Sequence, residues 1–299
     1  METSSDLELA LEIHNAVMPE RAASVADVLS WRQGVPERLE LVARVGGEPA
    51  GEGLAAVEPH QRGRSAATLD VCVLPERRRQ GVGSTLYRAF SAWAGAHGCE
   101  TLEVLIEAVD TDSLAFAERR GFAEIGRDSR LVLDLTRIET PAVEAPAGIE
   151  ITTWAERPGL VRGMYEVALE ALPDIPGGED DTVGPFEEWL ANELGGAADR
   201  PEATFVALAG DEVVGYAKFH LTEARPTVAL HDITGVKRAW RGRGIARTLK
   251  QAEIAWAKQA GYKELQTRNE LRNEPIRKLN EQFGYRELAG MVFLRGPLG

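Results

Sequence analysis

The sequence contains few cysteines and no long apolar run. Its two cysteines among 299 residues, Cys72 and Cys99, cannot form a disulfide framework, and neither lies in a CxxC or metal-ligand spacing. Both lie in or beside apolar segments, so we expect two buried thiols and no metal site. No apolar run approaches a membrane span, and the first residues lack the basic and apolar regions of a signal peptide. We therefore expect a soluble, cytoplasmic protein with no membrane partner.

Basic residues are also scarce. The chain has 34 lysines and arginines against 47 aspartates and glutamates, a net charge of −13, which disfavours a nucleic-acid partner. Two local clusters of basic residues, at 77–79 and 237–243, stand out against this background. They could be solvated residues of surface loops, but each lies at a glycine-containing turn, which favours anion binding.

Both turns connect a predicted strand to a predicted helix. The apolar run 66–74 leads into Arg-x-x-Gly-x-Gly at 78–83, and the run 228–236 leads into Arg-x-x-Gly-x-Ala at 241–246. The first turn of a helix has free N–H groups and the positive end of the dipole, and small residues let a phosphate approach the backbone. Each motif therefore predicts a pyrophosphate-binding turn.

The similarity between the two turns extends over a whole domain. Residues 73–122 align without a gap on residues 236–285, an offset of 163 positions, with 14 identities in 50. Such self-similarity indicates an internal duplication. Residues 140–148 have the composition of a linker. We therefore expect two domains, 1–138 and 149–299.

Periodicity and turn residues predict the same order of elements in both halves, except that the first half lacks an opening strand. We expect an α/β fold with a mixed, mostly antiparallel sheet flanked by helices in each half. In the first half we expect helices at 7–18, 24–32, 83–95 and 113–120, strands at 39–45, 50–57, 66–74 and 101–107, and a final pair of strands at 121–135. In the second half we expect helices at 157–170, 184–194, from the turn to Gly261 and at 275–282, strands at 149–154, 203–209, 213–220, 228–236 and 264–268, and a final pair of strands ending at 294.

The turn, followed after a short helix by Gly121-Phe122 or Gly284-Tyr285, resembles the GNAT acetyltransferase superfamily over nearly the whole chain. The resemblance implies two tandem GNAT-like domains, each with its sheet splayed between the fourth and fifth strands. It also implies acetyl-CoA as the acyl donor, with the pantetheine arm in the splay and the pyrophosphate on the turn amides. A tandem pair is similar in arrangement to the mycothiol synthase family.

By this resemblance, the cofactor-binding residues are those of the two turns and of the helix starts that follow, with one asparagine that faces the cofactor in the family. They are Val73, Arg78, Arg79, Gly81, Gly83 and Ser84 in the first half, and Val236, Lys237, Arg241, Gly242, Arg243, Gly244, Ala246, Arg247, Thr248 and Asn273 in the second. The alternative for Asn273 is a helix N-cap.

Acetyl transfer to an amine needs a group that accepts a proton. In this superfamily, bases commonly lie four or six residues before the motif valine, which gives Asp232 and Leu230 in the second half but Leu69 and Ala67 in the first. We predict Asp232 as the base, a catalytic second domain and a degenerate first domain. The alternative for Asp232 is a carboxylate bonded to loop amides or paired with a neighbouring arginine. His231 should point to the opposite face of its strand.

The tyrosine that assists the leaving thiolate in many members, four residues before the Gly-Phe, is absent. Ala117 and Asn280 stand at that position. Asn280 can offer an amide N–H, so it is the candidate for this role, although it cannot protonate a thiolate.

Residues 172–181 connect the two helices that the resemblance places over the acceptor. Asp174 and the acidic residues 179–181 would favour a cationic amine, unless they form a solvated acidic loop. Tyr216 is a candidate for the wall of the acceptor site, with a core position as the alternative.

Together these features predict an N-acetyltransferase that transfers the acetyl group of acetyl-CoA to a small-molecule primary amine by direct attack in a ternary complex. We expect a monomer or homodimer without a nucleic-acid partner. The missing tyrosine leaves open a non-catalytic module that senses acyl-CoA or another ligand, and acetylation of protein lysines is a third alternative.

Overall fold

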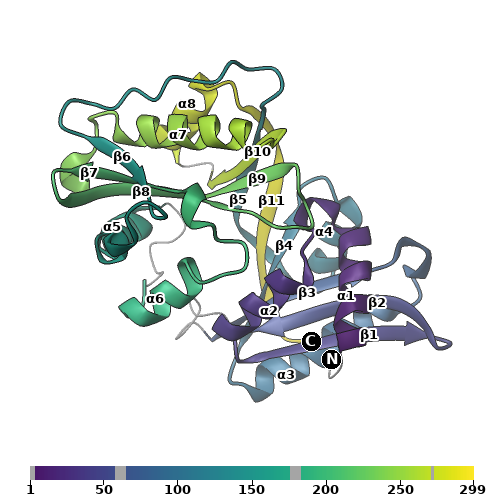
Figure 1. Ribbon diagram of the computed structural model, residues 1–299. Coiled ribbons are helices and arrows are strands. Elements are labelled where there is room, and N and C mark those ends of the chain that lie inside the picture. Colours follow the sequence, from purple (N-terminus) through teal and green to yellow (C-terminus); the bar gives the residue numbers. More distant parts are fainter. Residues whose placement is uncertain (1–3, 58–64, 176–182, 271–272) are drawn as a thin grey trace. The chain divides into compact units, whose positions relative to one another are not determined.

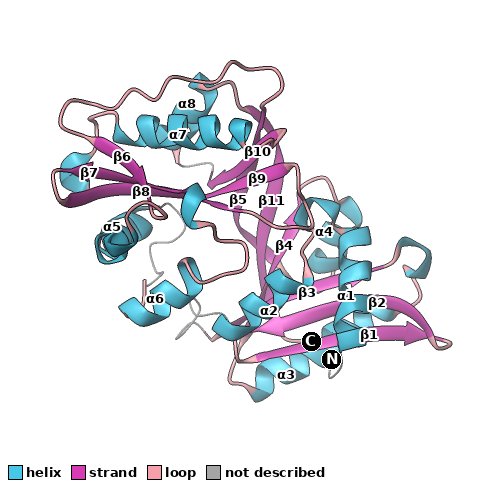
Figure 2. Cartoon of the chain, in the orientation of Figure 1, coloured by secondary structure: helices cyan, strands magenta, loops and turns pink. Residues whose placement is uncertain are grey.

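A computed structural model describes residues 4–57, 65–175, 183–270 and 273–299. The fold is α/β, as predicted (Figures 1 and 2). The helices are α1 (Ser4–Val17), α2 (Val25–Gly34), α3 (Val82–Ala96), α4 (Thr111–Glu118), α5 (Val161–Ala171), α6 (Phe186–Glu193), α7 (Ile245–Gln259) and α8 (Glu274–Gln282). The strands are β1 (Arg38–Val45), β2 (Glu48–Ala56), β3 (Ala66–Val73), β4 (Thr101–Glu107), β5 (Ala123–Asp134), β6 (Glu150–Thr153), β7 (Thr204–Ala209), β8 (Glu212–His220), β9 (Val228–Val236), β10 (Glu264–Glu270) and β11 (Arg286–Pro297). None of the described helices has the length and apolar character to cross a membrane.

The two predicted final pairs of strands were wrong. Each half ends in one long strand, β5 or β11, and the chain does not turn back at Gly126 within β5. The physical reason is burial: Leu131 and Leu133, in the second part of β5, enter an apolar core with α7, and Val292 and Leu294 of β11 enter another with α3. Burying these side chains stabilises a strand that continues rather than a hairpin.

The chain forms two compact units. The first comprises residues 1–127 and 289–299, and its sheet has the order β1-β2-β3-β4-β11. Helices cover both faces, because a Cβ on Gly53 of β2 would lie 2.9 Å from Phe90 of α3, whereas the adjacent Glu52 contacts His14 of α1. The two faces of this sheet thus meet different helices, as strand alternation requires.

The second unit comprises residues 128–288, and its sheet has the order β5-β10-β9-β8-β7-β6. One face packs on α7 around Leu249 and Ile254. The other packs on α5 and α6 around Met164 and Trp189 (Figure 1). Lys218 and Asp232, described below, lie on this second face.

The last strand of each unit comes from the other sequence repeat. The second part of β5, 128–134, pairs antiparallel with β10, and residues 291–297 of β11 pair antiparallel with β4. The two compact units therefore differ from the predicted segments 1–138 and 149–299 by one exchanged strand each.

The predicted splay is present in both units. The parallel ladder between β3 and β4 joins 66–68 to 101–103, and the ladder between β9 and β10 joins 228–230 to 264–266. Beyond these residues the described parts of the strands continue without pairing to each other. Their ends therefore separate and leave a wedge at the side where the two turns lie.

The strand exchange makes a testable prediction. Leu294→Ala removes a side chain that is 4 % exposed in the core of the first unit, so we expect the free energy of opening of β1–β3 to fall by about 2–5 kcal/mol. The matched variant Leu133→Ala should instead destabilise β7–β9. Hydrogen exchange measured by peptide mass spectrometry reports both. The opposite pattern would mean that the units follow the sequence repeats.

Candidate functional site

The two predicted phosphate turns have the same geometry. Arg78 donates from Nε to the carbonyl of Val73 at 3.3 Å, and Arg241 donates from Nε to the carbonyl of Val236 at 3.0 Å. In each unit the arginine therefore bridges the turn back to the last residue of the strand. This contact fixes the direction in which the following helix starts.

Glycine is required at the start of both helices. Gly81 precedes α3 with φ 87°, and Gly244 precedes α7 with φ 88°, a left-handed conformation that side chains disfavour. Arg79 and Gly242 also have positive φ, of 62° and 74°. Each turn leads directly into the first N–H groups of its helix, α3 or α7. At Gly81 there is also open space where a side chain would lie, since no atom is within 4 Å of a Cβ built there. This arrangement is suited to an anion.

A cavity of about 630 Å³ opens in the first unit, in the wedge between β3 and β4. Its wall includes the strand ends 69–71 and 104–107 and the ring of Phe116. All six cofactor-binding residues predicted for the first half line it, namely Val73, Arg78, Arg79, Gly81, Gly83 and Ser84. The cavity has the size of a small-molecule site.

In the second unit the turn arginines hold a carboxylate of the protein. Asp174, at the end of a short 3-10 helix (Leu172–Asp174), accepts from Nε and Nη2 of Arg238 at 2.8 Å and from Nη1 of Arg241 at 2.7 Å. The hydrogen bonds from Arg238 and then Arg241 hold the pKa of Asp174 well below its usual range. Asp174 was expected at the acceptor but lies on the turn. The acidic residues 179–181 lie outside the described residues.

Two further predicted residues of this turn have protein partners. The Lys237 ammonium lies 3.1 Å from both Glu166 and Glu212, so its charge is balanced within the unit. The Thr248 hydroxyl is buried and donates to the carbonyl of Glu144 at 2.9 Å. Both side chains are therefore engaged by groups of the protein itself.

Among the other predicted residues near the helix starts, Arg243 and Arg247 are exposed and Ser84 is half-buried. Ser84 accepts from Arg120 at 2.7 Å, and Arg247 donates to Gln282 at 2.6 Å. Arg243 is exposed and donates to a backbone carbonyl of its own turn at 3.2 Å. None of these contacts is strong enough to keep the side chain from a competing ligand.

A β-bulge positions Asp232. In the pairing of β8 with β9, Lys218 opposes Ile233 and Phe219 opposes His231, so Asp232 is the extra residue. The bulge turns its carboxylate toward the face that carries Lys218, at 2.5 Å. His231 points to the opposite face and is buried near α7, as predicted.

The predicted base is thus one half of an ion pair. Burial acts to raise the pKa of Asp232, but the Lys218 ammonium outweighs this effect and holds the pKa below its usual value. Asp199 binds the same ammonium at 2.8 Å. Asp232 consequently stays ionised and is a weak proton acceptor. The contacts of Asp232 are therefore those of the alternative given above, a paired carboxylate, except that its partner is Lys218 and not an arginine.

Sequence reasoning missed Glu193, the last residue of α6. It follows Trp189 by one helical turn, and the Trp189 ring packs edge-on against Tyr216 of β8 at 6.5 Å between centroids. Burial, with the negative charges of Asp232 and Asp199, raises the pKa of Glu193 to about 7. A carboxyl poised near neutrality beside the splayed strand is suited to general-base chemistry. In the sequence, the only sign of Glu193 was its place in one of the two helices expected over the acceptor site.

Three other predicted residues lie in or near the core. Asn280 is fully buried, and one of its two amide N–H groups donates to Asn269 at 2.8 Å. Tyr216 is fully buried in the core, the alternative given above. Asn273 occupies the N-cap position of α8, although its side chain makes no capping hydrogen bond.

Comparison with known proteins extends these observations. A family model described as the acetyltransferase (GNAT) family matches residues 8–122 and 162–285. The chain is 28% identical over 229 residues to a mycothiol acetyltransferase of Catenulispora acidiphila, covering 73% of this chain and 68% of the relative. It is 32% identical over 126 residues to an aminoglycoside N(6')-acetyltransferase type 1 of Stenotrophomonas maltophilia, covering 40% of this chain and 79% of that protein.

Solved structures share the fold. A GCN5-related N-acetyltransferase from Sphaerobacter thermophilus matches with a TM-score of 0.75 at 24% identity and covers 99% of this chain and 94% of that one. A tandem GNAT protein from the clavulanic acid biosynthesis pathway matches with a TM-score of 0.77 at 22% identity and covers 100% and 96%. At these identities the likeness supports the tandem fold.

The raised pKa of Glu193 makes a prediction about stability. The folded state keeps this proton where the unfolded chain has released it, so the free energy of unfolding falls as the pH rises from 4.5 to about 7. Glu193→Gln should therefore be stabilised relative to the parent by on the order of 3 kcal/mol at pH 8, and nearly unchanged at pH 5. Denaturant unfolding at both pH values measures this, with Glu187→Gln on the exposed side of α6 as the control. An equal difference at both pH values would contradict the assignment.

Proposed function

Because the chain belongs to the GNAT family of acetyltransferases, we propose that it transfers the acetyl group of acetyl-CoA to a small-molecule primary amine in its second unit. The observation that carries this proposal is the carboxyl of Glu193, poised near neutral pH beside Asp232 on the face of β9 that meets α6. In the first unit, whose wedge holds the cavity, the strand that corresponds to β9 is β3. It carries Asp70, which is paired with Arg21 at 3.1 Å.

Donor binding follows from the turn. The pyrophosphate takes the N–H groups at the start of α7 and the guanidiniums of Arg238 and Arg241, which now hold Asp174. That carboxylate demonstrates that the two arginines converge on one anion. The acyl-pantetheine arm then extends into the wedge between β9 and β10.

The chemistry removes two protons from an alkylammonium acceptor: the first leaves to solvent as the neutral amine forms, and the second leaves when the amine attacks. The amine nitrogen attacks the acetyl carbonyl carbon, Glu193 accepts the proton that the amine loses, and the bond to sulfur breaks with release of the CoA thiolate. Asp232 supports this step as the fixed negative charge that, with burial, keeps the pKa of Glu193 high. The buried Asn280 is left out of the step, and the thiolate takes its proton from solvent.

The charges of the site favour a cationic acceptor. Glu193, Asp199 and Asp232 surround the single ammonium of Lys218, so the cluster is net negative once Glu193 ionises. An incoming alkylammonium is therefore attracted and then deprotonated in place. The relatives named for mycothiol and aminoglycoside acetylation support a small-molecule amine as the acceptor class.

The deciding experiment is release of CoA from acetyl-CoA with a panel of amino sugars, aminoglycosides, polyamines and amino acids. With an active amine, Glu193→Gln should lower kcat by about 10²–10⁴-fold while the KM for acetyl-CoA stays the same. Arg241→Glu should raise that KM, and Arg78→Glu, the matched change in the first unit, should leave turnover unchanged.

Three results would overturn the proposal. Loss of turnover in Arg78→Glu alone would place transfer in the first unit. Binding of acetyl-CoA without CoA release from any amine would favour the ligand-sensing alternative, and release only with lysine-containing proteins would favour a protein acetyltransferase. Circular dichroism of each variant separates these outcomes from misfolding.

The ion pairs of Asp174 with Arg238 and Arg241 make a separate prediction. Asp174→Asn removes the negative charge that competes with the pyrophosphate for Arg238 and Arg241, so the KM for acetyl-CoA should fall several-fold. Glu170→Gln, which changes a carboxylate bonded only to the backbone N–H of Arg238 at 2.8 Å, is the control and should change it less. An increased KM in Asp174→Asn would show that the carboxylate supports the turn rather than competing with the donor.

A further inference from the structure

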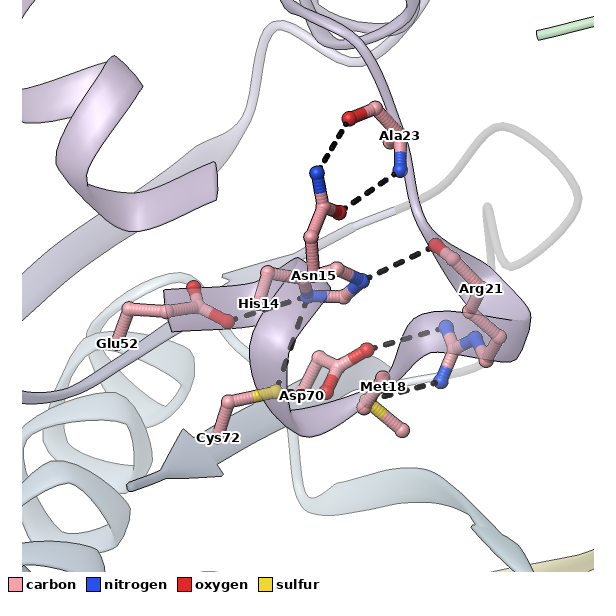
Figure 3. A network of polar contacts seen from close by, with 8 residues as sticks. All are labelled: His14, Asn15, Met18, Arg21, Ala23, Glu52, Asp70 and Cys72. Atoms are coloured by element: carbon pink, nitrogen blue, oxygen red, sulfur yellow. Dashed lines mark hydrogen bonds and ion pairs between the residues drawn. The ribbon is translucent and has the colours of Figure 1, made fainter. Parts of the chain in front are cut away.

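A cluster of three metal-ligand types lies in the first unit, away from the residues of the proposed reaction. His14 of α1, Glu52 of β2 and Cys72 of β3 place a ring nitrogen, a carboxylate oxygen and a sulfur within 4.8 Å of one another (Figure 3). Glu52 and Cys72 are buried, and His14 is partly exposed. These residues are far apart in sequence and lie in no recognised metal motif, which is why the sequence predicted no metal site.

The two separations from His14 match those of a tetrahedral zinc site. His14 Nδ1 lies 3.2 Å from Glu52 Oε1 and 3.7 Å from Cys72 Sγ. Zinc bonds of about 2.0 Å to nitrogen or oxygen and about 2.3 Å to sulfur, at a tetrahedral angle, put such ligand pairs about 3.3 and 3.6 Å apart. A mixed nitrogen, oxygen and sulfur donor set is also one that zinc accepts.

The orientation of His14 supports a cation between the three groups. Its Nε2 lies 3.3 Å from the carbonyl oxygen of Arg21, which can only accept, so this nitrogen carries a proton. In the neutral ring Nδ1 then presents a lone pair to the carboxylate of Glu52. Only a second proton or a metal ion makes that contact attractive. An imidazole that donates its distal N–H to a carbonyl is the usual outer contact of a metal ligand.

The surrounding contacts hold this arrangement in place. Asn15 makes two hydrogen bonds of 3.0 Å with the backbone of Ala23, which fixes the segment that carries the Arg21 carbonyl (Figure 3). The Arg21 side chain binds Asp70 at 3.1 Å. Asp70 Oδ1 in turn lies 4.0 Å from Cys72 Sγ, so a fourth oxygen ligand is within reach.

We propose that His14, Glu52 and Cys72 form a zinc site that ties α1 to the sheet of the first unit, with Asp70 or water as the fourth ligand. Burial raises the pKa of the Cys72 thiol, so zinc binding must displace its proton. The ion enters from the exposed side of His14. Because Val17 and Met18, at the end of α1, line the cavity, occupancy of the site would also fix one wall of that cavity.

The test uses Co²⁺ on the full chain after chelation of bound metal. Cobalt in a tetrahedral site with a thiolate ligand absorbs strongly, by charge transfer from sulfur and by d–d transitions. We expect one equivalent of Co²⁺ to give these bands, and one equivalent of Zn²⁺ to abolish them. The chain has only two cysteines, so Cys99→Ser should keep the bands and Cys72→Ser should lose them.

Further variants keep the test decisive if Cys72→Ser folds poorly. Glu52→Gln and His14→Gln should each weaken zinc binding by at least about tenfold, measured by competition with a chromophoric chelator. Zinc should raise the thermal midpoint of the parent chain but not of Cys72→Ser. Absence of a sulfur-to-cobalt band in the parent chain would overturn the proposal and leave a protonated His14 paired with Glu52. Loss of the band in Cys99→Ser would also overturn it.

Discussion

In each unit two parallel strands share hydrogen bonds over three residue pairs and then separate, and the rest of the site depends on that separation. Two features of the turn follow the open end of the first strand in each unit. One is an arginine that donates back to the last residue of the strand, and the other is a glycine in the left-handed conformation that starts the helix. The same contacts recur in the two units although the residues between them differ. The geometry of the turn thus recurs within one chain through one arginine contact and one left-handed glycine.

The two units differ in what lies beside the wedge. In the second unit Lys218 is buried among acidic groups, and one cation cannot satisfy all of them. Asp232 and Asp199 take the ammonium directly, and Glu193 is left with a proton that it can exchange near neutral pH. The raised pKa of one carboxyl is thus a result of its burial and of the negative charges of two others. A strand bulge, by adding one residue, brings the necessary negative charge to this face.

Local features could be predicted from the sequence, and features that join distant segments could not. The turns and the order of most elements follow from spacing within short stretches and from the repeat, and the splay was implied by the family resemblance. Glu193 could not be identified, because its properties arise from residues up to 39 positions away that only the fold assembles. The same holds for His14 and Cys72. The exchange of β5 and β11 was equally hidden, since both strands carry similar apolar patterns and either could complete either sheet.

The exchanged strands bear on how the protein is made. The strand that pairs with the free edge of β4 (residues 101–107) is formed by residues 291–297, which are translated only after all the intervening residues. Nearly two hundred residues must be translated while that edge is open. An unpaired strand edge is a template for association with other chains. Nascent chains of this protein therefore pass through a long aggregation-prone interval, in which a chaperone that covers strand edges would have most to protect.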